Sequence, residues 1–315
     1  MELFPSNSNI NFMRMRMVSL TIAFALMAIA MAAMAWGGFN YALDFTGGTL
    51  TEIKFQKPVN VEEMRKRLET NGFPGAEVRT FGTGTDIVIR MRLNKSNSDA
   101  SAIKLFSENV LKAAQTPDNQ GKVAPSVYIG PQIGNEFAWN GLKALVFVVL
   151  GFLIYVWARF EWKFAVAAII TTLHDVVLVS GWFAITKHEL DLAVLAGILS
   201  VMGYSISDTI VVFDRVRENF RNLQRVSPAE VLNRSVNQTL SRTIITSFVA
   251  FLTVLALYIF GGNSLKGMAE SQIIGIVFGT LSSIFVACPL LLWLGTTKQD
   301  LMPKAKDLAE LERRP

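Results

Sequence analysis

Long apolar runs divide the chain into six stretches, each about long enough to cross the hydrocarbon core of a membrane. They predict membrane spans over residues 17–36, 138–158, 164–186, 192–213, 242–260 and 273–294. The first run follows Arg14 and Arg16 and contains Ala-x-Ala patterns like those of a signal peptide. It is longer than the roughly 7–15 apolar residues of a signal peptide, so we interpret it as a retained first span.

Between the first two spans, residues 37–137 change to the pattern of a small water-exposed domain. Strand-like alternation and helical periodicity follow one another in the order β-α-β-β-α-β, which is typical of a ferredoxin-like fold. The predicted fold is therefore an α-helical polytopic membrane protein with six transmembrane helices and one external ferredoxin-like α+β domain after the first helix. This domain has no His, no Cys and no phosphate-binding loop, so we expect a contact or mechanical role and no enzymatic activity.

The basic residues of the short loops alternate along the chain. Segments 1–16, 159–163, 214–241 and 295–315 are rich in Lys and Arg, whereas the other short loops contain only Lys187 and Lys266. The positive-inside rule then predicts that both termini lie in the cytoplasm and that residues 37–137 lie outside. Residues 214–241 form an amphipathic connector, in which Ser227-Pro228-Ala229-Glu230 is a capping box that begins a helix running into the fifth span.

Composition supports this assignment and excludes several other classes. The chain has 315 residues, of which 51% are hydrophobic and 17% charged, and this is too apolar for an ordinary soluble domain. Its only cysteine, Cys288, rules out a disulfide within the chain and a cysteine-based metal site. We expect no metal and no cofactor. The net charge of +5 comes with a single aromatic residue, Phe220, among the basic ones of the connector, so we expect contact with the lipid bilayer and no nucleic acid.

One carboxylate falls inside the fourth predicted span. Asp208 shares a helical face with Gly197, Tyr204 and Val211, and such a small, polar face is expected to point into a helix bundle. A lone charge at the centre of a membrane helix costs about 2.5–3.5 kcal/mol on insertion scales, and burial favours the uncharged form of a carboxyl group. Asp208 is either a packing residue satisfied by hydroxyl groups or a proton carrier, and we favour the second.

Other polar residues accompany this aspartate. His174 and Asp175, near the middle of the third span, either form a packing hydrogen bond or titrate, and spacing does not decide which of the two titrates. Arg242 opens the fifth span and either reaches toward water at the helix end or pairs with Asp208. We hypothesise that an Asp208–Arg242 ion pair opens when Asp208 is protonated. Further candidates near Asp208 are Tyr204, Ser207 and Asp214.

Glycine-containing motifs stand at three more places. Two of them bracket the external domain and are either turns where the chain leaves and re-enters the membrane or a pair of hinges. Their candidate residues are Asp44, Phe45, Gly47, Gly48, Gly130, Pro131 and Gly134. In the sixth span, Gly275 and Gly279 form G-x-x-x-G, which predicts close helix packing.

The stretches Gly203–Asn219 and Asn237–Ser247, together with His174-Asp175 and Asp44–Gly48, closely resemble the SecF family of bacterial protein-export membrane subunits. The resemblance covers nearly the whole chain, and the family is similar to the resistance-nodulation-division (RND) exporters. It implies a multi-pass protein of the inner membrane that pairs with SecD, associates with the SecYEG channel and uses the proton motive force to pull unfolded exported polypeptides outward. The family's intramembrane aspartate and arginine correspond to Asp208 and Arg242, whereas Ser207 stands where an asparagine is expected.

Three other functions compete with this one. Half of a proton-coupled RND-type exporter would use the same bundle, and a structural assembly subunit would tolerate neutral residues at Asp208 and Arg242. An intramembrane aspartyl protease needs two aspartates at one depth. Asp175 and Asp208 differ in depth by roughly 9 Å when residues are counted along their helices, and neither follows a Gly-x-Gly run, which argues against a protease.

Overall fold

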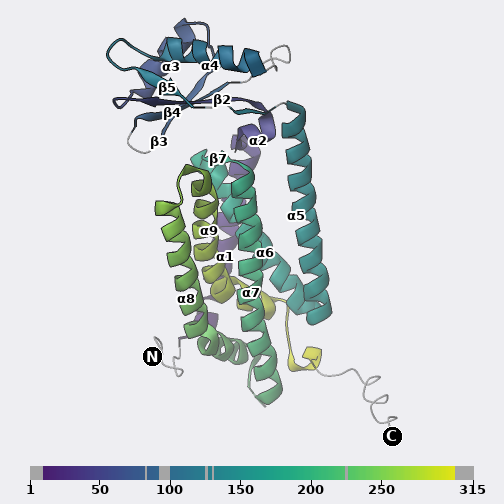
Figure 1. The fold of residues 1–315 in the computed structure, drawn as a ribbon. Coiled ribbons are helices and arrows are strands. Elements are labelled where there is room, and N and C mark those ends of the chain that lie inside the picture. The colour runs from purple at the N-terminus through teal and green to yellow at the C-terminus, as the bar shows by residue number, and fades with distance from the viewer. Residues whose placement is uncertain are drawn as a thin grey trace. The chain divides into compact units, whose positions relative to one another are not determined.

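The computed structural model describes residues 10–81, 84–91, 100–124, 127–129, 131–223 and 226–301. The chain forms two compact units. Unit 1 contains residues 1–40 and 144–315, and unit 2 contains residues 41–143. Figure 1 shows that unit 1 is a bundle of long helices and that unit 2 is a sheet with two helices on one of its faces.

Unit 2 is built around a small antiparallel sheet. The chain passes through β1 (Asn40–Tyr41), the short helix α2 (Leu43–Thr46), β2 (Gly48–Phe55), α3 (Val61–Thr70), β3 (Glu77–Phe81), β4 (Asp86–Met91), α4 (Ala100–Ala114), β5 (Gly121–Val123) and β6 (Val127–Ile129). The sheet order is β3-β4-β2-β5, and β6 pairs with β2 as well. This is the strand order of a ferredoxin-like fold, so the predicted fold of this domain is confirmed.

Alternation along β2 explains why the two helices cover one face of this sheet. Ile53 and Phe55 are buried, while Glu52 before them and Lys54 between them are exposed. The buried pair belongs to one apolar core with Met64 of α3 and Val110 of α4. Because buried and exposed residues alternate along the strand, one face of the sheet is apolar, and a single layer of amphipathic helices covers that face.

Unit 1 contains the long helices. They are α1 (Arg16–Ala32) with its flanking turns η1 (Phe12–Met15) and η2 (Ala33–Gly37), α5 (Pro131–Arg159), which begins in unit 2, α6 (Trp162–Thr186), α7 (Leu192–Asn222), α8 (Pro228–Phe260), α9 (Asn263–Ser282), the π-helical turn η3 (Ser283–Ala287) and α10 (Cys288–Trp293). A short strand, β7 (Glu189–Leu190), precedes α7, and a turn, η4 (Lys298–Leu301), follows α10. Within the described residues, six segments are long and apolar enough to cross a membrane, which confirms the predicted class.

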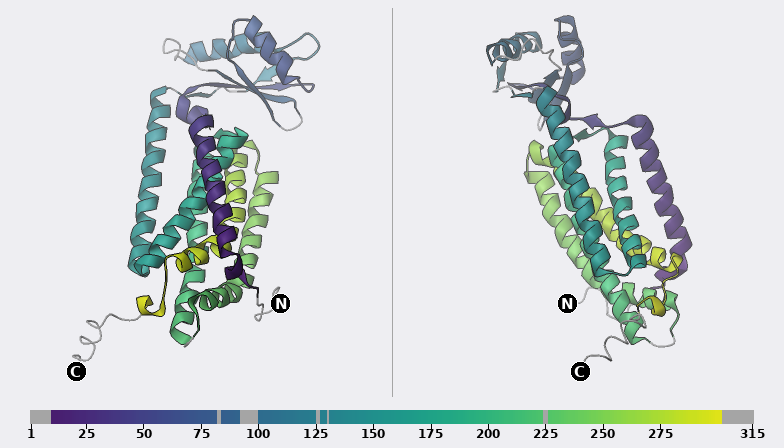
Figure 2. Two further views of the ribbon diagram at one scale, coloured as in Figure 1. Left: turned by 180° about the vertical axis from the view of Figure 1, so that it is seen from behind. Right: turned by 90° about the vertical axis from the view of Figure 1, so that its right-hand side faces the viewer.

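Several helices of unit 1 begin or end at the same end of the bundle, and local sequence signals set where they begin. The start of α1, the α5–α6 turn, the α7–α8 connection and α10 all lie at this end (Figures 1 and 2). Ser227 caps α8 by accepting a hydrogen bond from the Glu230 amide at 3.3 Å, with Pro228 at the first helical position, so the predicted start of this helix is confirmed. The connector predicted over 214–241 consists of the last turns of α7 and the first turns of α8, because both helices continue past the apolar runs.

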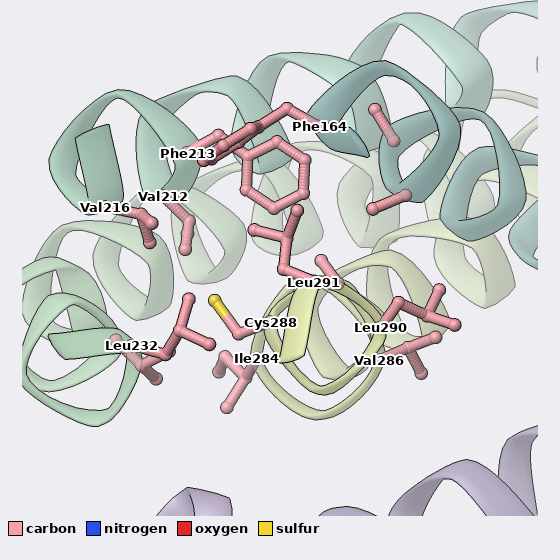
Figure 3. Packing of buried hydrophobic residues seen from close by; sticks show 14 of the residues in the cluster. Phe164, Val212, Phe213, Val216, Leu232, Ile284, Val286, Cys288, Leu290 and Leu291 are labelled. Atoms are coloured by element: carbon pink, nitrogen blue, oxygen red, sulfur yellow. The ribbon is translucent and has the colours of Figure 1, made fainter. Parts of the chain in front are cut away.

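An apolar cluster fills the same end of the bundle. Figure 3 shows the rings of Phe164 (α6) and Phe213 (α7) beside Leu291 of α10, with Cys288 among these side chains. The two rings meet edge to face, with their centroids 5.4 Å apart. This cluster ties α6, α7, α8 and α10 together and fixes the helix on which the candidate site lies.

Candidate functional site

Asp208 lies within α7 and directs its carboxylate toward α8. Its Oδ1 accepts a 2.9 Å hydrogen bond from the Thr243 hydroxyl. Its Oδ2 is buried and has no hydrogen-bond partner among the residues that the structure describes. The residue is 8% exposed. The Ser283 hydroxyl of η3 is also close enough to act on this carboxylate. A buried carboxylate whose neighbouring donors are neutral hydroxyls gains little stabilisation of its charge, so this geometry suits a group that holds a proton.

Arg242 does not complete this contact. It is exposed, and no ion pair with Asp208 within 4.0 Å occurs among the described residues. Neighbouring positions of a helix point about 100° apart, so α8 cannot direct both Thr243 and Arg242 straight at Asp208. The two charges are still close enough to attract each other. The Asp208–Arg242 pair therefore stays a prediction, and the structure shows an arrangement in which it is open.

A group of hydrogen-bonded hydroxyls lies one turn further along α8, at Ser247. The Ser247 hydroxyl donates to the Thr243 carbonyl oxygen at 2.7 Å, and Tyr204 donates to Ser247. Thr280 Oγ1 of α9 lies 2.7 Å from Ser247 Oγ. Tyr204 thus takes part in the predicted polar face of α7, and this face meets both α8 and α9.

A second buried carboxylate lies at the contact of α6, α7 and α9. Asp175 is 0% exposed. Its Oδ2 accepts hydrogen bonds from Ser205 of α7 at 2.6 Å and from Ser282 of α9 at 2.7 Å. Its Oδ1 lies 3.0 Å from Nδ1 of His174. His174 and Asp175 are therefore one hydrogen-bonded pair within a three-helix contact.

Glycines bring α7 and α9 close together beside these residues. A Cβ atom on Gly275 would lie 2.1 Å from a methyl carbon of Val201, which is far inside van der Waals contact. A Cβ on Gly279 would have its nearest neighbour, Asp175 Oδ2, at 3.7 Å, which is an ordinary contact. The two glycines of the G-x-x-x-G pattern are therefore not equivalent, and Gly275 is the one at the close approach.

Ser207 and Asp214 lie away from the Asp208 contact. Ser207 is exposed and lines a cavity of about 670 Å³ between α5 and α7. Asp214 accepts two 3.0 Å hydrogen bonds from one nitrogen of Arg159, at the end of α5. Asp214 is thus part of an ion pair at the end of the bundle, where it holds the α5–α6 turn against α7.

The glycine motifs around the external domain meet within unit 2. Gly47 and Gly48 have φ angles of +68° and +140°, which glycine adopts more easily than other residues. A Cβ on Gly134 would lie 2.9 Å from the Gly47 amide nitrogen and 3.1 Å from the Phe45 carbonyl oxygen. Asp44 falls in α2 and Pro131 begins α5, whereas Gly130 lies outside the described residues. The two motifs, far apart in sequence, therefore form one close backbone contact.

The sequence did not single out several residues that complete these contacts. Thr243, Ser205 and Ser282 are ordinary hydroxyl residues in apolar runs, and one chain alone gives no signal that they face a carboxylate. Asn237 entered the sequence analysis only as the first residue of the stretch Asn237–Ser247, with no contact assigned to it. Its side-chain amide holds both backbone groups of Ile10, at 3.0 and 2.9 Å, and so fastens the segment before α1 to α8.

The arrangement suits the storage and movement of protons more than bond-making chemistry. Both carboxylates are buried beside hydroxyl groups, which can donate or accept and therefore serve either protonation state. No group of three or more His, Cys, Asp or Glu side chains able to hold a metal ion occurs among the described residues.

Comparison with known protein families gives one consistent answer. The model described as "Protein export membrane protein SecD/SecF, C-terminal" matches residues 108–297, and the "SecD/SecF GG Motif" matches residues 37–59. The second match contains Gly47 and Gly48. The protein translocase subunit SecF of Vibrio alginolyticus is 36% identical over 316 residues, which is 100% of this chain and 99% of the relative. That of Pseudomonas aeruginosa is 40% identical over 96% of this chain and 97% of the relative.

Some relatives are longer, and this chain matches only part of their length. The protein translocase subunit SecDF of Brucella abortus is 34% identical over 98% of this chain, which corresponds to 40% of the relative. A crystal structure of SecDF from Thermus thermophilus, described as a translocon-associated membrane protein, has a TM-score of 0.82 and 35% identity over 93% of this chain and 40% of that chain. The relatives are named as translocase subunits, and their names state no catalysed reaction.

Proposed function

The chain belongs to the SecD/SecF family of protein-export membrane proteins, and we propose that it uses the proton motive force to drive a late stage of polypeptide export. The observation that carries this proposal is the buried Asp208, whose Oδ1 has Thr243 as its donor and whose Oδ2 has no partner among the described residues. One elementary charge that crosses the membrane gains about 2.3 kcal/mol per 100 mV.

Protonation of Asp208 removes the charge that attracts Arg242. In the proposed cycle, the ionised carboxylate draws Arg242 toward α7, and the protonated one stays on the Thr243 hydroxyl and releases the arginine. The exposed Arg242 and the intact Asp208–Thr243 hydrogen bond support assignment of the present structure to the released arrangement. Alternation between two packings of α7 and α8 would then be biased by each proton.

We propose SecD as the partner chain, because fused SecDF relatives contain a region matching this chain within a longer polypeptide. The SecYEG channel and the unfolded exported polypeptide are the other proposed partners. The location is the bacterial inner membrane with both termini in the cytoplasm, as the distribution of Lys and Arg predicts. The external domain would hold the emerging polypeptide, and the segments Asp44–Gly48 and Gly130–Gly134 would transmit movement along the chain to it.

The decisive experiment replaces Asp208 by Asn in cells that have no other copy of the gene. We expect normal protein level and assembly, but loss of reporter secretion and of proton flux in membrane vesicles. Glu218→Gln is the matched control, since Glu218 is an exposed acid later on the same helix, paired with Arg215. Normal secretion with Asp208→Asn would contradict the proposal and favour a structural assembly subunit. Loss of dye efflux with normal secretion would favour an RND-type exporter half.

A further inference from the structure

The hydrogen bonds of the His174–Asp175 pair indicate a different role for each of the two residues. The Ser205 hydroxyl has Asp175 Oδ2 as its partner, at 2.6 Å, and Ser282 reaches the same oxygen at 2.7 Å. The third contact joins Oδ1 to His174 Nδ1 at 3.0 Å. With the carboxylate ionised, all three neighbours can donate to it. Several hydrogen bonds to a carboxylate stabilise its charged form.

The same arrangement fixes the state of the imidazole ring. If Asp175 is ionised, Nδ1 of His174 carries a hydrogen and donates it to Oδ1. The proton of the neutral ring is then on Nδ1, and Nε2 is left with a lone pair. Nε2 is buried and has no hydrogen-bond partner among the described residues. The ring nitrogen that is available to a proton is therefore Nε2.

His174 also lines a cavity between α1 and the α9–η3 segment. The cavity has a volume of about 260 Å³. Its lining is apolar except for His174 and the hydroxyls of Ser19 and Ser282. His174 is 5% exposed and borders this space while its Nδ1 stays in contact with Asp175.

We propose that His174 takes up and releases a proton through Nε2, while Asp175 stays ionised and holds the ring in place. This inference deepens the proposed proton coupling and rests on it for its physiological purpose. In the step, the Nε2 lone pair forms an N–H bond with a proton delivered from water. The ring charge changes from 0 to +1, and the charge of the pair changes from −1 to 0.

The change in charge acts on the helix that carries Asp208. Ser205, bound to Asp175, lies three positions before Asp208 on α7, and the two carboxylates are close enough to repel each other. A proton on His174 reduces that repulsion. The other titratable groups on the packed helices are Arg16 of α1, Lys163 of α6, Tyr204, Asp214, Arg215, Arg217, Glu218 and Arg221 of α7, Glu230, Arg234, Arg242 and Tyr258 of α8, Lys266 and Glu270 of α9, and Cys288 of α10.

Nitrogen NMR on the full chain in lipid bilayers tests the proposal directly. The chain has two histidines, and His188→Gln leaves His174 as the only labelled ring. His188 is exposed and pairs with Glu270, away from the cavity. As the pH is lowered from alkaline to acidic, we expect Nε2 to gain a hydrogen while Nδ1 keeps its own. Nitrogen signals that stay constant over this range, or an infrared band of a protonated Asp175, would overturn the assignment.

Two substitutions separate titration from packing. Asp175→Asn removes the charge that stabilises the protonated ring, so His174 should stay neutral over the same range; unchanged titration would contradict the role of Asp175. His174→Asn keeps a donor near the Nδ1 position but has no titratable group. We expect its proton flux to lose its pH dependence at normal protein level, whereas a purely structural histidine predicts the wild-type pH profile. The NMR result decides the protonation site even if Asp208→Asn leaves export unchanged.

Discussion

The middle of α7 and its C-terminal end carry carboxylates in opposite surroundings. Asp214, near the end, is 41% exposed at its side chain and lies 3.0 Å from the Arg159 guanidinium. Asp208, six positions earlier, is buried and has Thr243 as its hydrogen-bond donor. Asp175, which contacts the middle of α7 through Ser205, has two hydroxyls and an imidazole as partners. The same residue type on one helix thus meets arginine at the end and hydroxyl groups in the middle.

This difference separates fixed charges from variable ones. A permanently charged guanidinium favours the ionised carboxylate, so the Asp214 contact has one useful protonation state. A hydroxyl group accepts as readily as it donates and remains a partner when the carboxyl gains a proton. Asp208 is therefore suited to a change of charge, and the end of α7 is suited to holding the helices in register.

The largest expected difference is in stability. Asp175→Leu leaves three buried donors without an acceptor, and we expect a loss of about 3–5 kcal/mol in the free energy of unfolding. Asp214→Leu removes the half-exposed ion pairs of Asp214 with Arg159 and Arg217 and should cost about 1 kcal/mol or less. Reversible unfolding in mixed micelles measures both. Equal losses would remove the distinction between the two regions.

Helix packing in the middle of α7 gives the next prediction. Gly275→Ala puts a methyl group against Val201, and overpacking of this kind typically costs about 1–3 kcal/mol. Gly279→Ala is the matched control in the same helix, because its methyl group meets only ordinary contacts. Val201→Ala should restore part of the stability lost in Gly275→Ala. Similar losses for both alanine variants, measured by the same unfolding assay, would show that close approach of α7 and α9 is unimportant.

Hydropathy, loop charge and motif resemblance were sufficient to predict the six spans and the ferredoxin-like domain. Both features depend on the local pattern of apolar and polar residues along the chain. They also marked Asp208 as facing a bundle, because Tyr204 and Gly197 share its helical face. They did not identify its donor. Arg242 and Thr243 are adjacent, and only the rotation of α8 about its axis decides which one meets Asp208. Asp175 meets Ser282 across 107 positions of sequence, and no periodicity in one chain reports such a contact.

A smaller effect is expected at the donor of Asp208. Thr243→Val replaces the hydroxyl by a methyl group of similar size and removes one hydrogen bond, worth about 1 kcal/mol net. Proton flux in vesicles should change by several-fold, up to about tenfold. Thr253→Val is the control on the same helix, because Thr253 is exposed and its hydroxyl contacts its own backbone at Val249. Identical flux in both variants would mean that Thr243 does not tune Asp208.

The smallest predicted effect concerns a fixed charge at the same end of the bundle as Asp214. Asp300 in η4 bonds to Lys163 of α6 at 2.8 Å and to the amide and hydroxyl of Thr297 at 2.7 and 2.9 Å. Partial burial works to raise the pKa of Asp300, but the hydrogen bonds and charge of these partners outweigh it and hold the pKa below its ordinary value. The unfolded chain then binds a proton at this carboxyl more readily than the folded one does.

The sign of the pH effect follows from this difference. The stabilisation is fully present above the ordinary aspartate pKa of about 3.9 and is lost as the pH falls through the lower pKa of the folded state. We expect about 1 kcal/mol or less, because the contact is partly open to water. Unfolding between neutral and acidic pH, compared with Asp300→Asn, measures it: the variant should be less stable near neutrality and equal to the parent in strong acid. A stability difference that persists in strong acid would mean that Asp300 acts through packing, unlike the other fixed charges at this end.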